Sequence, residues 1–215
     1  MVTMEAALPE DCSQGRRPGL DERSDEQLMK AFQKGETRAF EMLLLRHEKG
    51  VYRYALRMLA DTMQAEEVAQ ETFLRVIQSA GRYEAKAGFR NYLYRIARNL
   101  CIDLLRKRPR EAPTPLGDAE SAGTPEGIPD GNPGPESHVG AGQVRAAIRR
   151  ALSSLPADQR EAFLLKEVRD MKLQDVADIT GTNLNTVKSR LRYALIRLRE
   201  HLSEQGIGKE MGHEM

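Results

Sequence analysis

The apolar residues of this chain recur every three or four positions over several stretches, which is the spacing of one buried face of an α-helix. In the first half of the chain, this periodicity predicts three helices, over residues 36–54, 65–77 and 91–107. Pro109 ends the third helix, because proline has no backbone N–H to donate and its ring clashes with the preceding turn. We expect residues 24–108 to fold as one helical bundle.

The second half of the chain repeats this pattern in a shorter unit. Four helices are predicted, over residues 143–155, 157–168, 173–180 and 184–202. The strict alternation of apolar and polar residues that marks a half-buried strand is absent from the sequence. The fold class is therefore predicted to be all-α, with two small helical domains at residues 24–108 and 143–203.

The segment between the two domains has a different composition. Residues 109–142 hold 7 of the 10 prolines and 7 of the 17 glycines, with very few large apolar residues. Such a segment cannot bury enough surface to offset the entropy lost on ordering. We predict a flexible acidic linker here. The polar residues 1–23 and 204–215 are also predicted to be disordered, although a regulatory contact by the C-terminal tail stays open.

Charge adds a pattern that the overall balance conceals. The chain carries a net charge of only +1, which argues against a protein that is basic throughout. Residues 81–108 nevertheless carry 8 basic and 2 acidic groups, and residues 143–202 carry 12 and 7, whereas the linker carries 1 and 6. Two basic segments separated by an acidic one are typical of a protein that binds a polyanion such as nucleic acid.

Several function classes are disfavoured by the sequence. It has no apolar run of membrane-spanning length and no apolar core of a signal peptide, so a cytoplasmic protein without membrane insertion is expected. Cys12 and Cys101 are isolated, and Cys101 is interpreted as a small apolar residue at the edge of a helix core, with a redox switch as the alternative. The four histidines are scattered, so we expect no catalytic residues, no metal site, no cofactor and no enzyme activity.

The sharpest local motif is LQDVADITGTNLNTVKSRLR at residues 173–192. Ala177 is small enough for two helices to approach, Gly181 suits a tight turn with positive φ, and Val187 packs the second helix onto the first. This is the spacing of a DNA-binding helix-turn-helix. A solvated basic face on an ordinary helical hairpin is the alternative. The outward or flanking residues predicted to contact DNA are Thr186, Lys188, Ser189, Arg190 and Arg192.

The helix at residues 91–107 is amphipathic, with a basic and amide-rich face opposite an apolar one. Guanidinium groups can follow a nucleic-acid backbone, aromatic rings can stack on bases, and amides can contact base edges, so this face suits single-stranded nucleic acid. By itself the pattern is also compatible with a solvated face. The apolar face is expected to hold Leu93, Ala97, Leu100 and Leu104, and the polar face Asn91, Arg95, Arg98, Asn99 and Arg106, with Tyr94 at its margin.

Together these features resemble the bacterial RNA polymerase sigma factors of the extracytoplasmic-function (ECF) group. The resemblance covers residues 24–202 and is carried by five phrases: AFEMLLLRHEKGVYRYALRML, AEEVAQETFLRVI, FRNYLYRIARNLCIDLLRKR, LPADQREAFLLKEV and LQDVADITGTNLNTVKSRLRYALIRLREHL. It implies a region 2 domain that binds the clamp helices of core RNA polymerase and opens the −10 element. It also implies a region 4 domain that recognises duplex −35 DNA and docks on the polymerase flap.

The resemblance also implies roles for individual residues. A polar helix face is implied to bind polymerase through Glu66, Glu67, Gln70, Glu71 and Arg75, with a solvated face as the alternative for the carboxylates. The −10 contacts are implied for Phe89, Tyr94, Arg95, Arg98, Asn99 and Arg106, with burial in the core as the alternative for Phe89 and Tyr94. Tyr92 stands where many family members have Trp, so its hydroxyl needs a partner or water if it is buried. Tyr193 stands where basic residues are common in the family.

We therefore expect a sigma factor that binds core RNA polymerase and promoter DNA, is a monomer when free, and has an anti-sigma factor as a further partner. The alternative is an autonomous helix-turn-helix transcriptional regulator with a helical sensing domain. That alternative predicts a dimer that binds specific duplex DNA without polymerase. The basic helix and the linker argue against it.

Overall fold

The computed structural model describes residues 22–84, 88–107 and 138–206, and within these ranges it contains helices but no strands. The all-α prediction is confirmed. The first domain consists of α1 (Asp25–Gln33), α2 (Thr37–Leu59), α3 (Thr62–Ser79), the 3-10 turn η1 (Ala80–Arg82) and α4 (Phe89–Lys107). The second consists of α5 (His138–Ser154), α6 (Ala157–Phe163), the π-helical turn η4 (Leu164–Val168), α7 (Leu173–Thr180) and α8 (Leu184–Glu204).

Several details differ from the predicted elements, and α2 ends at Leu59, five residues beyond the predicted end at 54. Helix α1 was not predicted, although Ser24 and Gln27 form a capping box in which each side chain bonds the backbone N–H of the other. Helix α5 begins at His138, five residues before the predicted start at 143, because Gly140 and Gly142 weakened the helical signal. The helix predicted over 157–168 widens into a π-helical turn after Phe163.

The first domain packs its helices around one apolar core. Helix α2 lies against α1, α3 and α4, and the core is filled by fully buried side chains from all four helices, among them Leu28, Leu43, Met58, Val76 and Leu93. The carboxylate of Glu26 in α1 accepts a hydrogen bond from the backbone N–H of Phe89 at 3.1 Å. This bond satisfies the first amide of α4, a group that no residue within the helix can pair.

The second domain contains the predicted helix-turn-helix. Gly181 ends α7 with φ of +67°, and Asn183 caps α8 by accepting a hydrogen bond from the backbone N–H of Thr186. Ala177 and Val187 are buried where α7 and α8 meet. The turn geometry predicted from these residues is therefore present.

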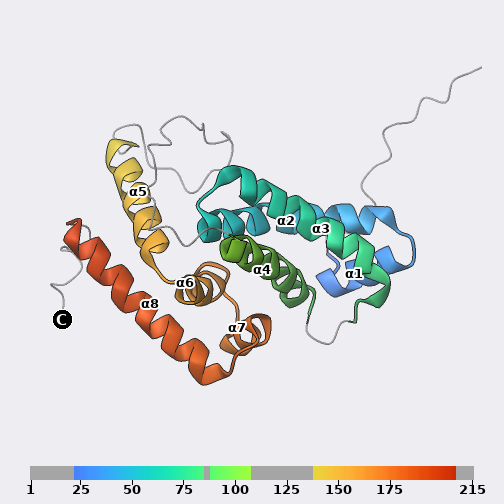
Figure 1. Ribbon diagram of the computed structural model, residues 1–215. Helices are drawn as coiled ribbons and strands as arrows, with labels where there is room; N and C mark the ends of the chain where they lie inside the picture. Colours follow the sequence, from blue (N-terminus) through green and yellow to red (C-terminus); the bar gives the residue numbers. More distant parts are fainter. Residues whose placement is uncertain (1–21, 85–87, 108–137, 207–215) are drawn as a thin grey trace, which may run out of the picture.

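The two domains lie in contact. Figure 1 shows α4 between helices α2 and α3 of the first domain and α6 and α7 of the second, and α4 packs directly against α7. Helix α2 also contacts α5 and α6. The predicted polar segment at 1–23, the acidic linker and the C-terminal tail fall largely outside the described residues.

Candidate nucleic-acid interface

Helix α4 is held by the first domain along a face that differs slightly from the predicted one. Leu93 and Ala97 are buried as expected, and Cys101 is also fully buried, whereas Leu100 and Leu104 are only half-buried. The inward face is therefore rotated toward Tyr94 and Cys101. Burial raises the pKa of the Cys101 thiol to about 12. Such a group is a poor thiolate nucleophile, consistent with its interpretation as an apolar core residue.

The polar face of α4 presents three predicted −10 residues to solvent. Arg95, Asn99 and Arg106 are exposed, while Arg98 is half-buried. Their spacing along the helix places guanidinium and amide groups on one side of α4, which is the arrangement that contacts to a nucleic-acid strand require.

The two aromatic residues predicted for the −10 site lie in the core. Phe89 is 0% exposed, with ring centroids 5.5 Å from His47 and 6.1 Å from Tyr83. Tyr94 is also buried and meets the ring of Tyr54 edge-on at 5.5 Å. Burial raises the pKa of Tyr94. Both rings are therefore packed in the core in this conformation, which was the alternative to a contact with DNA.

Tyr92 has the partner that its hydroxyl was expected to need. The Tyr92 hydroxyl is hydrogen-bonded to the hydroxyl of Ser79 at the end of α3, and its ring packs against Tyr83 with centroids 5.1 Å apart. A tyrosine in this position therefore ties α4 to α3 through both a polar and an aromatic contact.

The N-terminal part of the polar face of α4 contacts the second domain. The Asn91 amide donates to the Asp175 carboxylate at 2.7 Å, and an Arg95 guanidinium nitrogen donates to the Asp178 carbonyl at 3.2 Å. Arg98 Nε donates to the Glu161 carboxylate at 2.5 Å. These three polar side chains of α4 therefore have partners in α6 and α7.

Glu161 and Arg160 make the most buried of these contacts. The Glu161 side chain is only 1% exposed, so desolvation raises its pKa, and the hydrogen bond from Arg98 opposes that shift. The buried Arg160 guanidinium donates to the Met58 carbonyl of α2 at 2.6 Å and to the Leu155 carbonyl at 3.0 Å. Adjacent residues of α6 thus contact both α2 and α4.

Sequence analysis missed these inter-domain residues. The segment around Glu161 was assigned to a helix only for its apolar residues, and Asp175 and Asp178 were not assigned a role. The available signal was a carboxylate within an apolar helical stretch, in EAFLL at residues 161–165. A charged residue in such a position is expected to be paired if it is buried.

The residues predicted to contact the −35 element lie in the N-terminal half of α8, but they differ in exposure and in the partners that their side chains already have. Lys188 and Arg192 are exposed. The Thr186 and Ser189 hydroxyls bond within their own turn, to Asn183 and to the Thr186 carbonyl. Arg190 pairs with Asp158 of α6 at 3.1 Å. The charged groups that α8 offers to a polyanion on this face are therefore those of Lys188 and Arg192.

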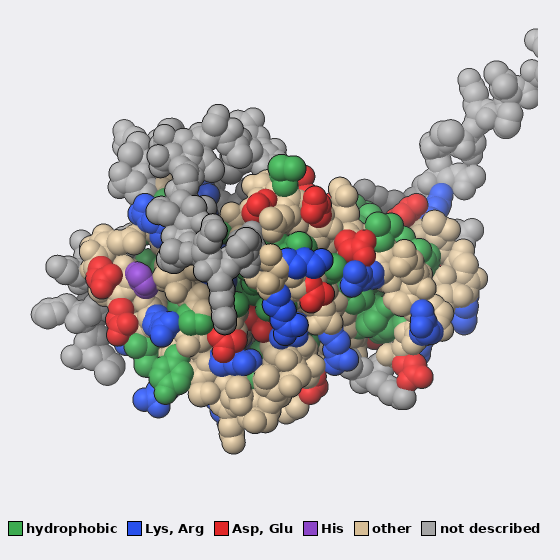
Figure 2. All heavy atoms as spheres, viewed as in Figure 1, with side chains coloured by type: hydrophobic (Ala, Val, Ile, Leu, Met, Phe, Trp, Pro, Cys, Tyr) green, Lys and Arg blue, Asp and Glu red, His purple; other side chains and the backbone are tan. Residues whose placement is uncertain are grey.

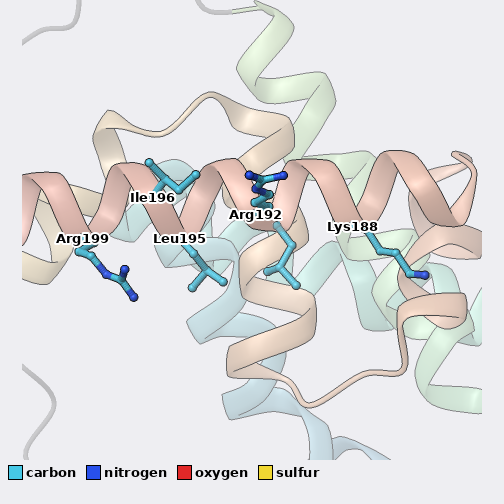
Figure 3. A pocket seen from close by; sticks show the side chains of 6 residues that line it. Lys188, Arg192, Leu195, Ile196 and Arg199 are labelled. Atoms are coloured by element: carbon cyan, nitrogen blue, oxygen red, sulfur yellow. The ribbon is translucent and has the colours of Figure 1, made fainter. Parts of the chain in front are cut away.

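The same side of α8 carries an apolar strip between its charges. Figure 3 shows Lys188, Leu195 and Arg199 pointing to one side of the helix, and a shallow hollow here is lined also by Leu191, Arg192 and Ile196. Over the face of the molecule in Figure 2, Lys and Arg side chains lie interspersed with Asp and Glu. This face therefore carries mixed charge.

The residues predicted to bind polymerase lie together on α3. Glu66, Glu67 and Gln70 are exposed, and Glu71 forms an ion pair with Arg75 at 2.7 Å. The same helix carries exposed apolar side chains: Met63 and Leu74, which sequence analysis did not single out, and Ile77, which was expected on the apolar face. A polar face flanked by exposed apolar residues is a common feature of a protein-binding surface.

The part of the chain that the structure describes offers neither a metal-binding cluster nor a membrane-spanning helix. No cluster of three or more His, Cys, Asp or Glu side chains there is arranged to hold a metal ion. Among the same residues, no helix combines the length and the apolar character needed to cross a bilayer.

Comparison with known proteins identifies two sequence regions. Residues 43–111 match the family model of Sigma-70 region 2, and residues 145–198 match that of Sigma-70, region 4. The RNA polymerase sigma-H factor of Pseudomonas aeruginosa is 30% identical over 80% of this chain and 90% of its own length. The ECF RNA polymerase sigma factor SigW of Bacillus subtilis is 31% identical over 82% of this chain and 95% of its own length.

A solved structure has a similar fold. The sigma factor RpoE of Bartonella quintana, in complex with the anti-sigma factor NepR, is 25% identical with a TM-score of 0.60. The match covers 76% of this chain and 96% of the RpoE chain. Both the sequence matches and this structure therefore include the two helical domains.

Proposed function

This chain belongs to the ECF group of RNA polymerase sigma factors, which direct promoter-specific transcription initiation, and we propose that α4 and α8 divide promoter recognition between them. In this proposal, α4 binds the separated strand of the −10 element and α8 enters the major groove of the −35 duplex. The observation that supports it most directly is the pair of exposed cationic helix faces, each supported by a separate domain.

On α8, the proposed contacts differ in kind. Lys188 and Arg192 are exposed and can reach phosphates or base edges. Thr186 and Ser189 lie beside them with hydroxyls that can exchange a local bond for one to DNA. Arg190 is paired with Asp158, so we assign it the role of holding α8 against α6 until DNA competes for its guanidinium group.

On α4, we assign the first contacts to Arg95, Asn99 and Arg106, with Arg98 joining them when it separates from Glu161. Extruding a base costs a few kcal/mol of stacking, which polar contacts and ring stacking must offset. Phe89 and Tyr94 can line a base pocket only after their neighbours move. Their present role is to support the helix that carries the polar side chains.

Core polymerase is the proposed partner of the α3 surface formed by Glu66, Glu67, Gln70, Glu71 and Arg75. Polymerase supplies the chemistry of RNA synthesis, so we propose a non-enzymatic role for this chain in the bacterial cytoplasm. We also propose a second partner, an anti-sigma factor, because the similar RpoE structure is a complex with one. The flap of polymerase is assigned to the second domain.

The proposal predicts different defects for Asn99→Ala and Lys188→Ala. With core polymerase, Asn99→Ala should leave upstream duplex contacts intact but reduce strand opening at the −10 element, measured by permanganate reactivity of unpaired thymines. Lys188→Ala should weaken upstream protection in footprinting, since one phosphate or base contact is lost. Losing one good base contact typically costs about 1–3 kcal/mol, which is roughly 5- to 150-fold in binding.

Arg197→Ala is the matched control for Lys188→Ala. Both remove one exposed positive charge from α8, but nine residues at about 100° each place Arg197 on the opposite side of the helix. The control should retain upstream protection. Equal loss in the two variants, or unaltered opening by Asn99→Ala, would contradict the assigned contacts. An autonomous regulator would instead protect duplex DNA as a dimer without polymerase.

A further inference from the structure

We propose that α1 positions α4 for −10 recognition: through Glu26 and Gln33 it holds both ends of the segment that joins η1 to α4, and it thereby sharpens base selectivity at the −10 element. We call this pair of contacts the α1 bridge. The inference rests on the function proposed for α4. It gives a role to a helix that lies before the segment matched by Sigma-70 region 2, which begins at residue 43.

The α1 bridge reaches the backbone on each side of the joining segment. On the η1 side, the Gln33 side-chain amide donates to the Ala80 carbonyl at 2.7 Å and to the Tyr83 carbonyl at 3.0 Å. On the α4 side, a carboxylate oxygen of Glu26 accepts the hydrogen bond from the backbone N–H of Phe89. Because the partners are backbone groups, the bridge holds the path of the chain at both ends.

Helical geometry fixes the distance between the two contacts. Glu26 and Gln33 both belong to α1 and are seven residues apart. Seven residues make almost two full turns, so the two side chains project from the same side of the helix. A rise of 1.5 Å per residue places them about 10 Å apart along the axis. The two ends of the joining segment are therefore held at a spacing that α1 sets.

Helix α1 is itself fixed to the first domain. Leu28 and Met29 are fully buried in the core. The Asp25 carboxylate bonds His47 and Arg46 of α2. The α1 bridge is thus anchored in the core, so its contacts fix the joining segment relative to α2.

The Glu26 contact also suits the start of a helix. The hydrogen bond from Phe89 holds the pKa of the Glu26 carboxyl below its usual value of 4.5, although burial opposes the shift. Glu26 is therefore ionised at neutral pH, and its charge lies at the positive end of the α4 dipole. An added Cβ on Gly88, whose φ is +74°, would lie 3.5 Å from Glu26 Oε1. The carboxylate is thus close to the point where the chain enters α4.

Aromatic packing joins the same two ends but defines their position less sharply. The Tyr83 ring lies 6.1 Å from the Phe89 ring and 5.1 Å from the Tyr92 ring, between centroids. Aromatic pairs are favourable over a range of offsets and tilts, whereas a hydrogen bond weakens steeply when its geometry changes. Loss of the α1 bridge should therefore loosen the start of α4 while the aromatic core stays packed.

The start of α4 matters because the same helix carries the proposed −10 contacts. Arg95 and Asn99 follow Phe89 by six and ten positions, so a tilt or shift of the first turn moves both side chains. A selective contact must be held to within about 0.5 Å of its productive geometry. Phosphate contacts, in contrast, carry no sequence information. Loosening the α1 bridge should accordingly reduce discrimination between bases more than total binding.

The test uses two variants that break the α1 bridge and two controls. Glu26→Ala and Gln33→Ala each remove one end of it. Glu26→Gln keeps a side-chain oxygen that can accept the Phe89 N–H, so it should retain wild-type selectivity. Glu36→Ala is the matched control for Glu26→Ala, because it removes a carboxylate whose ion pair, at 3.1 Å, is with Arg23 before α1.

Selectivity is measured by transcription with core polymerase on a library of templates, each with a transcribed barcode. The upstream element is held at the sequence that the wild type selects, and the start-proximal positions are randomised. Sequencing the barcodes gives the ratio of the preferred base to the next base at each position. A variant that is only less stable lowers initiation on all templates in proportion and leaves this ratio unchanged. Circular dichroism checks that each variant retains its helices.

In both bridge variants, we expect the ratio to fall about threefold or more at one or more start-proximal positions, with Glu26→Gln and Glu36→Ala within about twofold of the wild type. A second library, randomised only in the upstream element, should show unchanged preferences for all variants. Unchanged start-proximal ratios in folded Glu26→Ala and Gln33→Ala would overturn the role of the α1 bridge. An equal fall in Glu36→Ala, or in the upstream library, would also overturn it.

The outcome for Asn99→Ala separates this inference from the function proposed for α4. If Asn99→Ala impairs strand opening while the bridge variants keep wild-type ratios, the role of the α1 bridge is wrong and the function of α4 stands. If Asn99→Ala has no effect on opening, the function proposed for α4 fails, and the inference that rests on it fails as well.

Discussion

At the scale of single residues, Asp25 shows how one carboxylate joins two helices of the first domain. It lies in the first turn of α1 and accepts hydrogen bonds from His47 Nε2 at 2.7 Å and Arg46 Nη1 at 2.9 Å, both in α2. The hydrogen bond from His47, followed by that from Arg46, holds the pKa of Asp25 below its usual value of 3.8, although burial opposes the shift.

Asp25→Asn is therefore expected to lower the free energy of unfolding by about 1–2 kcal/mol at pH 7, since hydrogen bonds to a charged group are lost. A depressed pKa in the folded state contributes stability above the unfolded-state pKa and loses it as pH falls through the folded-state value. The deficit of the variant should therefore shrink below about pH 4. Urea unfolding at pH 7 and pH 3 measures both effects.

Glu41→Gln, which neutralises an exposed carboxylate on α2, is the control for this prediction. It should change the free energy of unfolding by less than about 0.5 kcal/mol at either pH. A deficit for Asp25→Asn that is the same at pH 7 and pH 3 would show that ionisation of Asp25 does not stabilise the fold.

Residue-level burial was the least predictable property of the candidate site. Phe89 and Tyr94 were assigned to DNA by family resemblance, with core packing left as the alternative, because an aromatic ring suits either environment. The structure buries both, through contacts with His47, Tyr83 and Tyr54 that lie tens of residues away in sequence. A one-dimensional pattern could not choose between these environments, since it contains no information about which helix lies opposite.

At the scale of elements, the helix-turn-helix depends on a turn that only certain residues adopt without strain. Gly181 has φ of +67°, in the left-handed region, and an added Cβ there would meet open space. The cost of a side chain is therefore one of backbone conformation and not of packing. It amounts to about 1–2 kcal/mol for most residues, and less for asparagine.

Gly181→Ala should accordingly lower the free energy of unfolding by about 1 kcal/mol, and Gly181→Asn by less. Both should also reduce −35 binding to a degree that follows the loss of stability, because the turn sets the angle of α8. Chemical unfolding and footprinting on the same two variants measure this relation. Equal stability for alanine and wild type would contradict the turn geometry.

Helices were the most predictable elements, because each buries an apolar face that recurs with the helical period. The predicted helices over 65–77, 173–180 and 184–202 match α3, α7 and α8 closely. Helix α1 was missed because it is short, with only Leu28 and Met29 as fully buried residues. The π-helical turn after Phe163 was missed because its local apolar pattern is the same as that of an α-helix.

At the scale of the whole molecule, the arrangement of the two domains was not predictable from the sequence. A linker of 34 residues was expected to leave their spacing free, yet Arg160 and Arg169 reach into the first domain, and Asn91 and Arg98 pair with the second. The hydrogen-bonded residues of these inter-domain pairs lie 63 to 102 positions apart in the sequence. The basic segments seen in the charge pattern are partly paired by acceptors of the same chain.

This pairing changes the meaning of the near-neutral net charge. The net charge of +1 is the sum of the basic faces of α4 and α8 and of acidic groups elsewhere in the chain. Two of these acidic groups, carboxylates on α6 and α7, contact the polar face of α4. Non-specific attraction to DNA is therefore limited in the free chain, since it depends on unpaired positive charge. We expect both faces to be used fully when polymerase presents them to a promoter.

The most direct test of the central claim is transcription in vitro with purified core polymerase over a library of promoter fragments. We predict that the full chain makes polymerase initiate at a subset of templates that share an upstream element and a start-proximal element. Asn99→Ala and Lys188→Ala should each reduce that selective initiation. A folded chain that binds polymerase but initiates at no template, or at all templates equally, would contradict the account.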